Sequence, residues 1–406
     1  MTVDVMNLKE AVEIIYDEHR QTQGERNAAE LAALTKKWAW YMGESVTAGD
    51  KVYEMKPIPT RLWPTMAQLF ENQLMANPRM NSLWEATLKT HVSLPEKWSL
   101  PLIRQIFPEL IMMKICSIQP MPPSSGGVTK AFFWKVYRTD KSPEELVTTN
   151  DSSYALSGER EVPKRLRGEL TSVSVTATKD MLNATWSQEL EEDLMGAMGI
   201  NIESEMLTAM AGEIMRELEQ RVIQDILNGA TAGNVNWDAT VPSGYTRVDW
   251  YETLYHSLLD AEKLVRTNRH QRTNYLVCGL DFVTYLLKTQ RFQAKEGNEP
   301  VEGPLSAGTR FEGSFGGRWQ VYSTPYMTSA KAILSYYPIG MFHAGYIYMP
   351  YIPLMPMERT YADMRPFDDA TLPGALENRD MWNRNVRTRW GKYLCAPDMF
   401  ATVTIT

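Results

Sequence analysis

The sequence predicts an α+β fold, and three observations support that prediction. Ten apolar residues recur at a spacing of four between Leu190 and Ile226, a pattern typical of helical structure of unusual length. Other tracts, such as residues 169–178, alternate apolar and polar side chains with the two-residue period of a strand. The chain has 406 residues, of which 44% are hydrophobic and 22% charged, so it is an ordinary globular sequence long enough for two or three lobes.

Charge and cysteine usage argue against several classes of protein. The formal net charge of −7 disfavours a protein that grips nucleic acid through a general basic surface. Cys116, Cys278 and Cys395 are far apart and odd in number, so we expect buried thiols in a reducing compartment rather than disulfides or a zinc site. The chain shows no secretion leader and no apolar run long enough to span a bilayer, which predicts a cytosolic protein without a membrane anchor.

Residues 1–98 are predicted to alternate between helix and irregular structure. Asn7 and Glu10 have the spacing of a cap for a first helix, and a second helical segment covers residues 31–41. After Gly49 the pattern is broken by prolines, which favour turns and disfavour long helices: Pro57, Pro59, Pro64, Pro78 and Pro95. We therefore expect an N-terminal arm that lies on something outside itself.

The pattern changes near residue 100. A short amphipathic helix over residues 102–107 ends at Pro108, and the apolar run 110–118 is typical of a strand. Residues 119–127 are rich in proline, serine and glycine, which predicts a loop.

Two β tracts, residues 131–138 and 169–178, follow that loop. They are separated by about thirty polar residues, a length that is uncommon for a structureless loop inside a compact domain. We expect a long two-stranded excursion that projects from the body. Its charged residues either form a solvated loop or contact a neighbouring copy, and we favour the second interpretation for Lys141, Glu144, Glu145, Arg160, Glu161, Lys164 and Arg165.

The apolar row between Leu190 and Ile226 is expected to form two helices. Gly199 can supply the left-handed residue that ends a helix, and Asn201 can cap the next one. We therefore expect a short helix near residues 185–198 and a long one near 202–228. The buried core of the long helix is expected to contain Ile202, Met206, Met210, Ile214, Leu218 and Val222.

The remainder of the chain alternates between helix and strand signals. The pattern predicts a loop at 229–244, a helix at 248–266, a strand at 274–278, a helix at 280–288, a glycine-rich loop, and strands at 318–323 and 332–336. Strand-like tracts at 345–356 and 387–397 bracket an irregular insertion, and a last strand covers 400–405.

The sequence contains no pattern that points to catalysis. The acidic residues at 189–193 are explained by a helix N-terminus, and Gly313, Gly316 and Gly317 fit a hairpin turn before Trp319 better than a phosphate loop. The five histidines lack metal-ligand spacing, and no nucleophile elbow is found. We therefore expect no enzyme activity, no cofactor and no metal, although a triad assembled from distant residues stays an alternative.

Four tracts, in order, resemble the major capsid proteins of T-even-type tailed phages. They are Leu100-Pro101-Leu102-Ile103-Arg104 with Pro108-Glu109-Leu110-Ile111 and Gln119-Pro120-Met121; the helix pair 190–226 with Glu203-Ser204-Glu205-Met206 and Glu213-Ile214-Met215; Arg318-Trp319-Gln320-Val321-Tyr322 with Pro325-Tyr326; and the sequence from Gly345 to Leu354 with Arg387-Thr388-Arg389-Trp390-Gly391. Together they cover roughly residues 100–395.

The resemblance implies an HK97-type capsid fold. It divides the chain into an N-terminal arm (1–98), the start of a peripheral domain (99–130), an E-loop with flanking strands (131–178), the peripheral domain with a spine helix (179–244), an axial domain (245–340), and return strands to the peripheral domain with an insertion near 363–383 (341–406).

The resemblance also implies a function. It is that of a major capsid protein that self-assembles into hexameric and pentameric capsomers of an icosahedral head, assembled in the host cytoplasm and enclosing double-stranded DNA without sequence-specific binding. Implied partners are further copies of the chain and scaffold, portal, vertex and decoration proteins, with no membrane. A pentameric vertex protein, an encapsulin-like shell and a cytosolic α/β-type enzyme stay as alternatives.

Overall fold

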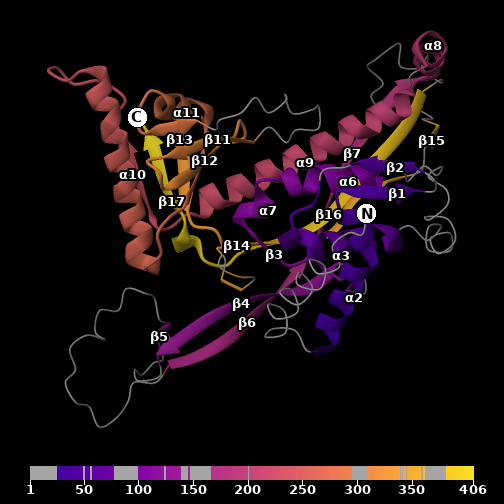
Figure 1. Ribbon diagram of the computed structural model, residues 1–406, viewed down its shortest axis with the longest axis horizontal. Helices are drawn as coiled ribbons and strands as arrows, with labels where there is room; N and C mark the ends of the chain where they lie inside the picture. The colour runs from indigo at the N-terminus through magenta and orange to yellow at the C-terminus, as the bar shows by residue number, and fades with distance from the viewer. Residues whose placement is uncertain are drawn as a thin grey trace, which may run out of the picture.

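The computed structural model shows an elongated subunit in which one long helix joins two lobes (Figure 1). Helices and strands both contribute to each lobe, so the predicted α+β class is confirmed. The structure describes residues 25–48, 51–54, 57–76, 99–122, 125–138, 145–146, 166–199, 201–294, 309–338, 340, 342–343, 345–357, 360–361 and 381–406.

One lobe is built on a seven-stranded sheet with the order β10-β11-β12-β9-β13-β17-β8. Its strands are β8 (Gly233–Trp237), β9 (Tyr275–Cys278), β10 (Phe292–Ala294), β11 (Arg310–Phe315), β12 (Trp319–Ser323), β13 (Lys331–Ser335) and β17 (Ala401–Ile405). Central β9 is buried at every position, while β8 and β10 form the edges. The hairpin turn expected before Trp319 is confirmed, since β11 and β12 pair antiparallel around it.

Two helices complete this lobe, α10 (Arg247–Arg269) and α11 (Leu280–Leu287). Thr246 caps the start of α10 by accepting a hydrogen bond from the Asp249 N–H at 3.2 Å. α10 packs across β8 and β17, which lie parallel to each other. Both strands therefore belong to this sheet, which corrects the expectation that the C-terminal strands all return to the other lobe.

The second lobe contains a five-stranded sheet. Its strands are β3 (Ser117–Ile118), β7 (Thr178–Ser187), β14 (Tyr346–Pro356), β15 (Thr360–Tyr361) and β16 (Met381–Leu394). The long strand β16 pairs with β14, β15 and β7, and all three pairings are antiparallel. β16 begins six residues before the predicted tract because its polar first half pairs with β7, a strand that the sequence analysis missed.

Two helices follow β7, namely α8 (Gln188–Met198) and α9 (Ile202–Gly229). Gly199 ends α8 in the left-handed conformation with φ of 65°, and the Asn201 side chain accepts hydrogen bonds from the first N–H groups of α9. The predicted division into two helices is confirmed. α9 is 28 residues long and packs on β7 and β16 of the second lobe.

Part of the predicted N-terminal arm packs on its own chain. Its described elements are α2 (Glu25–Met42), β1 (Ser45–Ala48), β2 (Lys51–Glu54), the 3-10 turn η1 (Thr60–Leu62) and α3 (Trp63–Ala76). The Asn72 side chain of α3 donates to the carbonyl oxygens of Met121 and Tyr351 at 2.8 and 2.7 Å, and α3 contacts β14. These residues therefore need no outside surface, and the first helix proposed at residue 7 lies outside the described residues.

α3 also corrects the expectation of no long helix after Gly49. Pro64 is its second residue, where the missing proline N–H would have no partner within the helix. A proline in the first turn starts a helix instead of ending one.

The apolar run 110–118 is not the single strand that was predicted, because residues 112–115 form a helical turn and only residues 117–118 form a strand. After α6 (Ser99–Ile106) and η3 (Phe107–Glu109), the chain forms a single turn, α7 (Met112–Ile115), before β3. The Met113 N–H donates to the Leu110 carbonyl at 3.1 Å, and this segment is buried in the main apolar core. When a short segment is buried on all sides, most of its residues are apolar, so the spacing of apolar residues cannot distinguish a helix from a strand.

The order of elements is the one that the HK97-type fold implies. A projecting hairpin is followed by a long helix, a lobe around a helix and sheet, and strands that return to pair beside the long helix (Figure 1). This expectation is confirmed.

Candidate functional site

The hairpin that leaves the second lobe is the first candidate interaction surface (Figure 1). Its strands β4 (Val128–Arg138) and β6 (Leu166–Thr176) pair antiparallel along their whole length. A two-residue strand, β5 (Glu145–Leu146), adds to the outer end of β4. The predicted two-stranded excursion is confirmed.

The base of the hairpin is fixed to the lobe. Phe133 and Val175 are buried in a small apolar cluster that includes Met349 of β14. The Gln119 side chain donates to the Phe132 carbonyl oxygen at 2.7 Å and accepts from the Phe132 N–H at 2.9 Å, so it replaces a strand partner at this edge. The fold therefore sets the direction in which the hairpin projects.

Farther out, the hairpin exposes large apolar side chains. Trp134 is 46% exposed, and Leu170, directly opposite on β6, is 38% exposed. The Trp134 ring leans over Gly168, where an added Cβ would come within 2.3 Å of the ring carbon Cζ2. The next pair along the ladder, Lys135 and Glu169, carries opposite charges. Aromatic side chains beside mixed charge are typical of surfaces that meet another protein.

Only one of the charged residues proposed as assembly contacts lies in the part of the chain that the structure describes. Glu145 lies in β5, where its backbone pairs with Arg138 of β4. The others fall outside the described residues: Lys141, Glu144, Arg160, Glu161, Lys164 and Arg165. Their role as contacts stays a prediction.

Helix α8 is a second exposed apolar surface. It has no buried residue, and Leu190, Met195 and Met198 are 44%, 54% and 68% exposed. The first part of the apolar row in the sequence is therefore not core, because α8 stands at the end of the long helix (Figure 1). The acidic residues Glu189 and Glu191 lie in its first turn, as a helix N-terminus favours.

Helix α9 holds the two lobes together. Five of the six predicted core residues are buried, and Met206 is half-buried against the same core: Ile202, Met206, Met210, Ile214, Leu218 and Val222. A second buried row, offset from the first, contains Leu207, Ala211, Met215, Glu219 and Ile223. Two rows at a spacing of four form one broad buried face along the helix.

Glu219 is the residue of α9 that sequence reasoning missed. Its carboxylate is fully buried, accepts a hydrogen bond from the Ile111 N–H at 2.8 Å, and accepts another from the Thr309 hydroxyl at 2.8 Å. Burial raises the pKa of this carboxyl to about 7, against the opposing effect of those hydrogen bonds and of Lys114. One acidic side chain thus ties the long helix to α7 and to the start of β11. In the sequence, Glu219 interrupts a row of apolar residues spaced four apart, and this interruption could have identified it as a buried acid.

The polar side of α9 is tied to the sheet of the second lobe. Asp225 accepts hydrogen bonds from the Tyr346 hydroxyl at 2.9 Å and from the Lys392 ammonium at 2.5 Å. Arg221 pairs with Asp180 of β7 at 2.5 Å. These contacts fix the orientation of the helix. Each of the four charged side chains, Asp180, Arg221, Asp225 and Lys392, has a partner of opposite charge, as in a structural ion pair.

The three cysteines are free thiols. Cys116 and Cys278 are buried, and burial raises the pKa of each thiol well above its usual range. Burial also raises the pKa of the Cys395 thiol, to about 12. Thiols held in the protonated form are poor nucleophiles and poor metal ligands, which agrees with the predicted structural role.

Within the described ranges, no three His, Cys, Asp or Glu side chains are grouped so that they could hold a metal ion. In the same part of the chain, the helices are too short or too polar to cross a membrane.

Comparison with known proteins identifies one family. Residues 149–369, which are 221 of the 406 residues, match the family described as "Major capsid protein Gp23". Two similar relatives are the major capsid proteins of Vibrio phage KVP40, 26% identical over 206 residues, and of Enterobacteria phage T4, 23% identical over 201 residues. Each alignment covers 45% of this chain and 39% of the relative, so the matched part is less than half the length of these relatives.

Solved structures with a related arrangement include one from Mycobacterium phage Adephagia. It has a TM-score of 0.44 and 12% sequence identity, and the alignment covers 73% of this chain and 90% of that one.

Proposed function

Because the chain belongs to the Gp23 family of phage major capsid proteins, we propose that copies of it associate into capsomers and then into the closed shell of a phage head. The observation that carries this proposal, beside the family, is the projecting hairpin. Its base is anchored in the lobe, and its outer half presents Trp134 and Leu170 to solvent. Such a pair is suited to cover a neighbouring copy, where both side chains would become buried.

The two lobes suggest a division of labour within the shell. The seven-stranded lobe with α10 and α11 corresponds to the axial domain and would surround the capsomer centre. The lobe with α9 and the five-stranded sheet corresponds to the peripheral domain. The exposed helix α8, at the opposite end of α9 from the axial lobe, would meet a different neighbour from the hairpin (Figure 1). Several moderate interfaces on each copy are typical of obligate assemblies.

We further propose that the shell holds packaged double-stranded DNA without gripping its sequence, and that assembly takes place in the host cytoplasm. The net charge of −7 supports containment over tight binding. Scaffold, portal, vertex and decoration proteins are the partners that such an assembly would use.

A double substitution of the exposed pair tests the role of the hairpin. Trp134→Ser with Leu170→Ser should leave the subunit folded, because both side chains are exposed, and should abolish capsomers or shells seen by sedimentation and negative-stain microscopy. The matched control is Trp40→Ser on α2 with Met75→Ser on α3, two side chains that are 41% and 49% exposed on helices to which no assembly contact is assigned. If the hairpin variant assembles as well as the unaltered chain, the hairpin has no part in assembly.

A further inference from the structure

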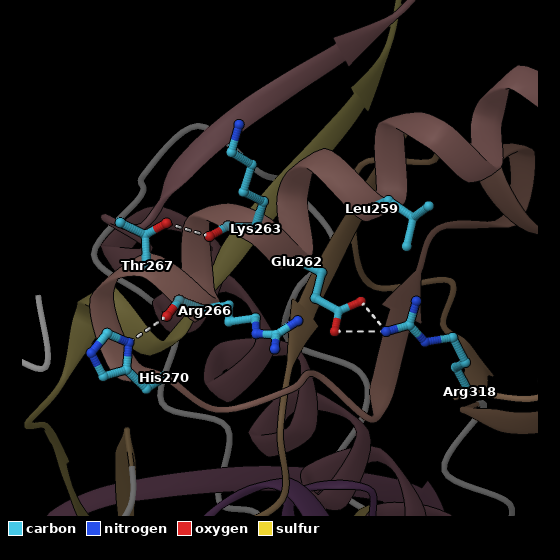
Figure 2. Close-up of a pocket in the computed structure, with 7 residues that line it drawn as sticks. All are labelled: Leu259, Glu262, Lys263, Arg266, Thr267, His270 and Arg318. Carbon is cyan, nitrogen blue, oxygen red and sulfur yellow. Dashed lines mark hydrogen bonds and ion pairs between the residues drawn. The ribbon is translucent and has the colours of Figure 1, made fainter.

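A pocket on the axial lobe concentrates positive charge in an otherwise acidic chain (Figure 2). It is about 460 Å³ in volume and lies between the C-terminal half of α10 and the residue that precedes β12. The lining residues are Leu259, Glu262, Lys263, Arg266, Thr267, His270 and Arg318. The lining includes three cationic side chains and one carboxylate, whereas the whole chain carries a net charge of −7. Arg266 and Arg318 lie near the carboxylate, and the Lys263 side chain extends away from it (Figure 2).

The carboxylate in the pocket is already used to position an arginine. Glu262 is only 3% exposed and pairs with the Arg318 guanidinium at 2.9 Å, with Arg272 farther away at 3.7 Å. Arg318 also lies over the Trp319 ring, with its guanidinium carbon 5.2 Å from the ring centre. The guanidinium of Arg318 is thus held in one place at the wall of the pocket, which lowers the entropy cost of binding an anion.

Two other cations line the pocket without a carboxylate partner. Arg266 is one turn after Glu262 on α10, yet no ion pair joins the Arg266 side chain to any carboxylate that the structure describes, and the same holds for Lys263. Figure 2 shows the Arg266 side chain extending from α10 toward the Glu262 and Arg318 pair. Cations at the end of a helix are favoured by its dipole, but the dipole does not require Arg266 to extend toward a second guanidinium group.

His270 adds an independent signal at the same place. Among the residues that the structure describes, it is the only one besides glycine with a positive φ, at 53°, a conformation that costs free energy for a residue with a side chain. Its ring nitrogen Nδ1 lies 3.1 Å from the Arg266 carbonyl oxygen, which assigns the donor role to Nδ1 and leaves Nε2 for another partner. A helix end of this kind usually carries glycine or asparagine, so the histidine at this position is the unusual choice.

We propose that this pocket binds an oxyanion of the phosphate class, held by Arg266 and the positioned Arg318, with Lys263 adding positive charge at the rim. Guanidinium groups bind phosphate through paired, charge-assisted hydrogen bonds, which explains why two arginines and not two lysines flank the cavity. The phosphate can come from free inorganic phosphate or from the backbone of a nucleic acid. The pocket lies on the axial lobe and away from the hairpin, so it adds a ligand to the shell protein and does not depend on the role of the hairpin.

Binding is tested on the full chain by calorimetry with two probes, inorganic phosphate and a short DNA duplex of mixed sequence. The test variant is Lys263→Gln with Arg266→Gln, which keeps Arg318 paired to the buried Glu262. We expect at least about tenfold weaker binding, because the charge-assisted contact of Arg266 and the nearby charge of Lys263 are both lost. The control is Arg247→Gln at the other end of α10, which is exposed and should bind within about twofold of the unaltered chain.

The two probes separate the sources of the anion. If inorganic phosphate binds and displaces the duplex, the site accepts the free ion as well as the phosphate groups of a nucleic-acid backbone. Duplex binding that phosphate does not displace, but that the double variant loses, supports the nucleic-acid backbone as the source. The proposal is overturned if the unaltered chain binds neither probe, or if the double variant binds as tightly as the control while unfolding at the same temperature.

Discussion

Glu219→Gln gives the sharpest test of how the long helix is held. The Glu219 carboxylate is fully buried and bonds the Ile111 N–H and the Thr309 hydroxyl, one from each of two segments that pack on α9. A glutamine has the same shape, can accept from the Ile111 N–H with its oxygen, and can donate to the Thr309 oxygen with its nitrogen. The substitution therefore removes the titration while keeping the two contacts.

The sign of the effect follows from the two states of the carboxyl. Its pKa is about 7 in the folded chain, against 4.5 as an ordinary carboxyl, because burial disfavours the charged form. Between pH 4.5 and 7 the folded state holds the proton and the unfolded state does not, so the free energy of unfolding falls as pH rises and levels off above pH 7. At about 1.4 kcal/mol for each pKa unit, the loss across the full window of about 2.5 units is about 3.5 kcal/mol.

Urea unfolding of the unassembled subunit at about pH 5 and about pH 8 measures this loss. We expect Glu219→Gln to lower the difference in the free energy of unfolding between these two pH values by about 2.5 kcal/mol relative to the unaltered chain, since the range from about pH 5 to about pH 8 covers most of the window. The control is Glu213→Gln on the same helix, whose side chain is 58% exposed and should leave the pH dependence almost unchanged. An unaltered pH dependence in Glu219→Gln would refute the assignment of a buried, titrating carboxyl at the centre of the subunit.

Three further predictions concern the long helix, its start and the hairpin. Ile214→Asp should cost several kcal/mol in the free energy of unfolding, since it places an unpaired charge where the side chain is 2% exposed; normal unfolding and assembly would mean that α9 is not the spine. Gly199→Ala should cost about 1 kcal/mol by thermal unfolding through backbone strain alone, because φ is +65° and no atom lies within 4 Å of the added Cβ. Arg160→Glu with Lys164→Glu should leave the subunit folded but impair assembly in sedimentation, and unchanged assembly would make this segment a plain solvated loop.

Features with local causes were predicted correctly from sequence. The end of α8 at Gly199 and the start of α9 at Asn201 depend on one left-handed residue and one side-chain cap, both of which act within a few residues. The alternation that predicted β6 also holds, since Val175 and Ala177 are buried while Ser174 is exposed. Such signals need no knowledge of the rest of the chain.

Features that depend on distant partners were missed. The polar strand β8 exists because it pairs with β17, where the Asn234 side chain accepts from the hydroxyls of Thr402 and Thr404 at 3.0 Å. In the same way β7 forms against β16, about two hundred residues away in sequence. No local pattern reports a partner at such a separation.

The candidate surfaces show the same limit. Charge drew attention to residues 138–168, whereas the structure exposes large apolar side chains elsewhere, Trp134 and Leu170 on the hairpin and Met198 on α8. A sequence cannot distinguish an apolar residue in the core from one awaiting a partner, because both have the same period. The pocket beside Glu262 was equally invisible, since Arg266 and Arg318 come from separate elements.

The size of the particles formed by the purified full chain tests the central claim most directly. Analytical ultracentrifugation with negative-stain microscopy, with and without a scaffold protein, should show capsomers or closed shells, as a chain of the major capsid protein family that presents an anchored hairpin would form. A small oligomer that stays unchanged under every condition, with no capsomers or shells even beside a scaffold, would contradict the account.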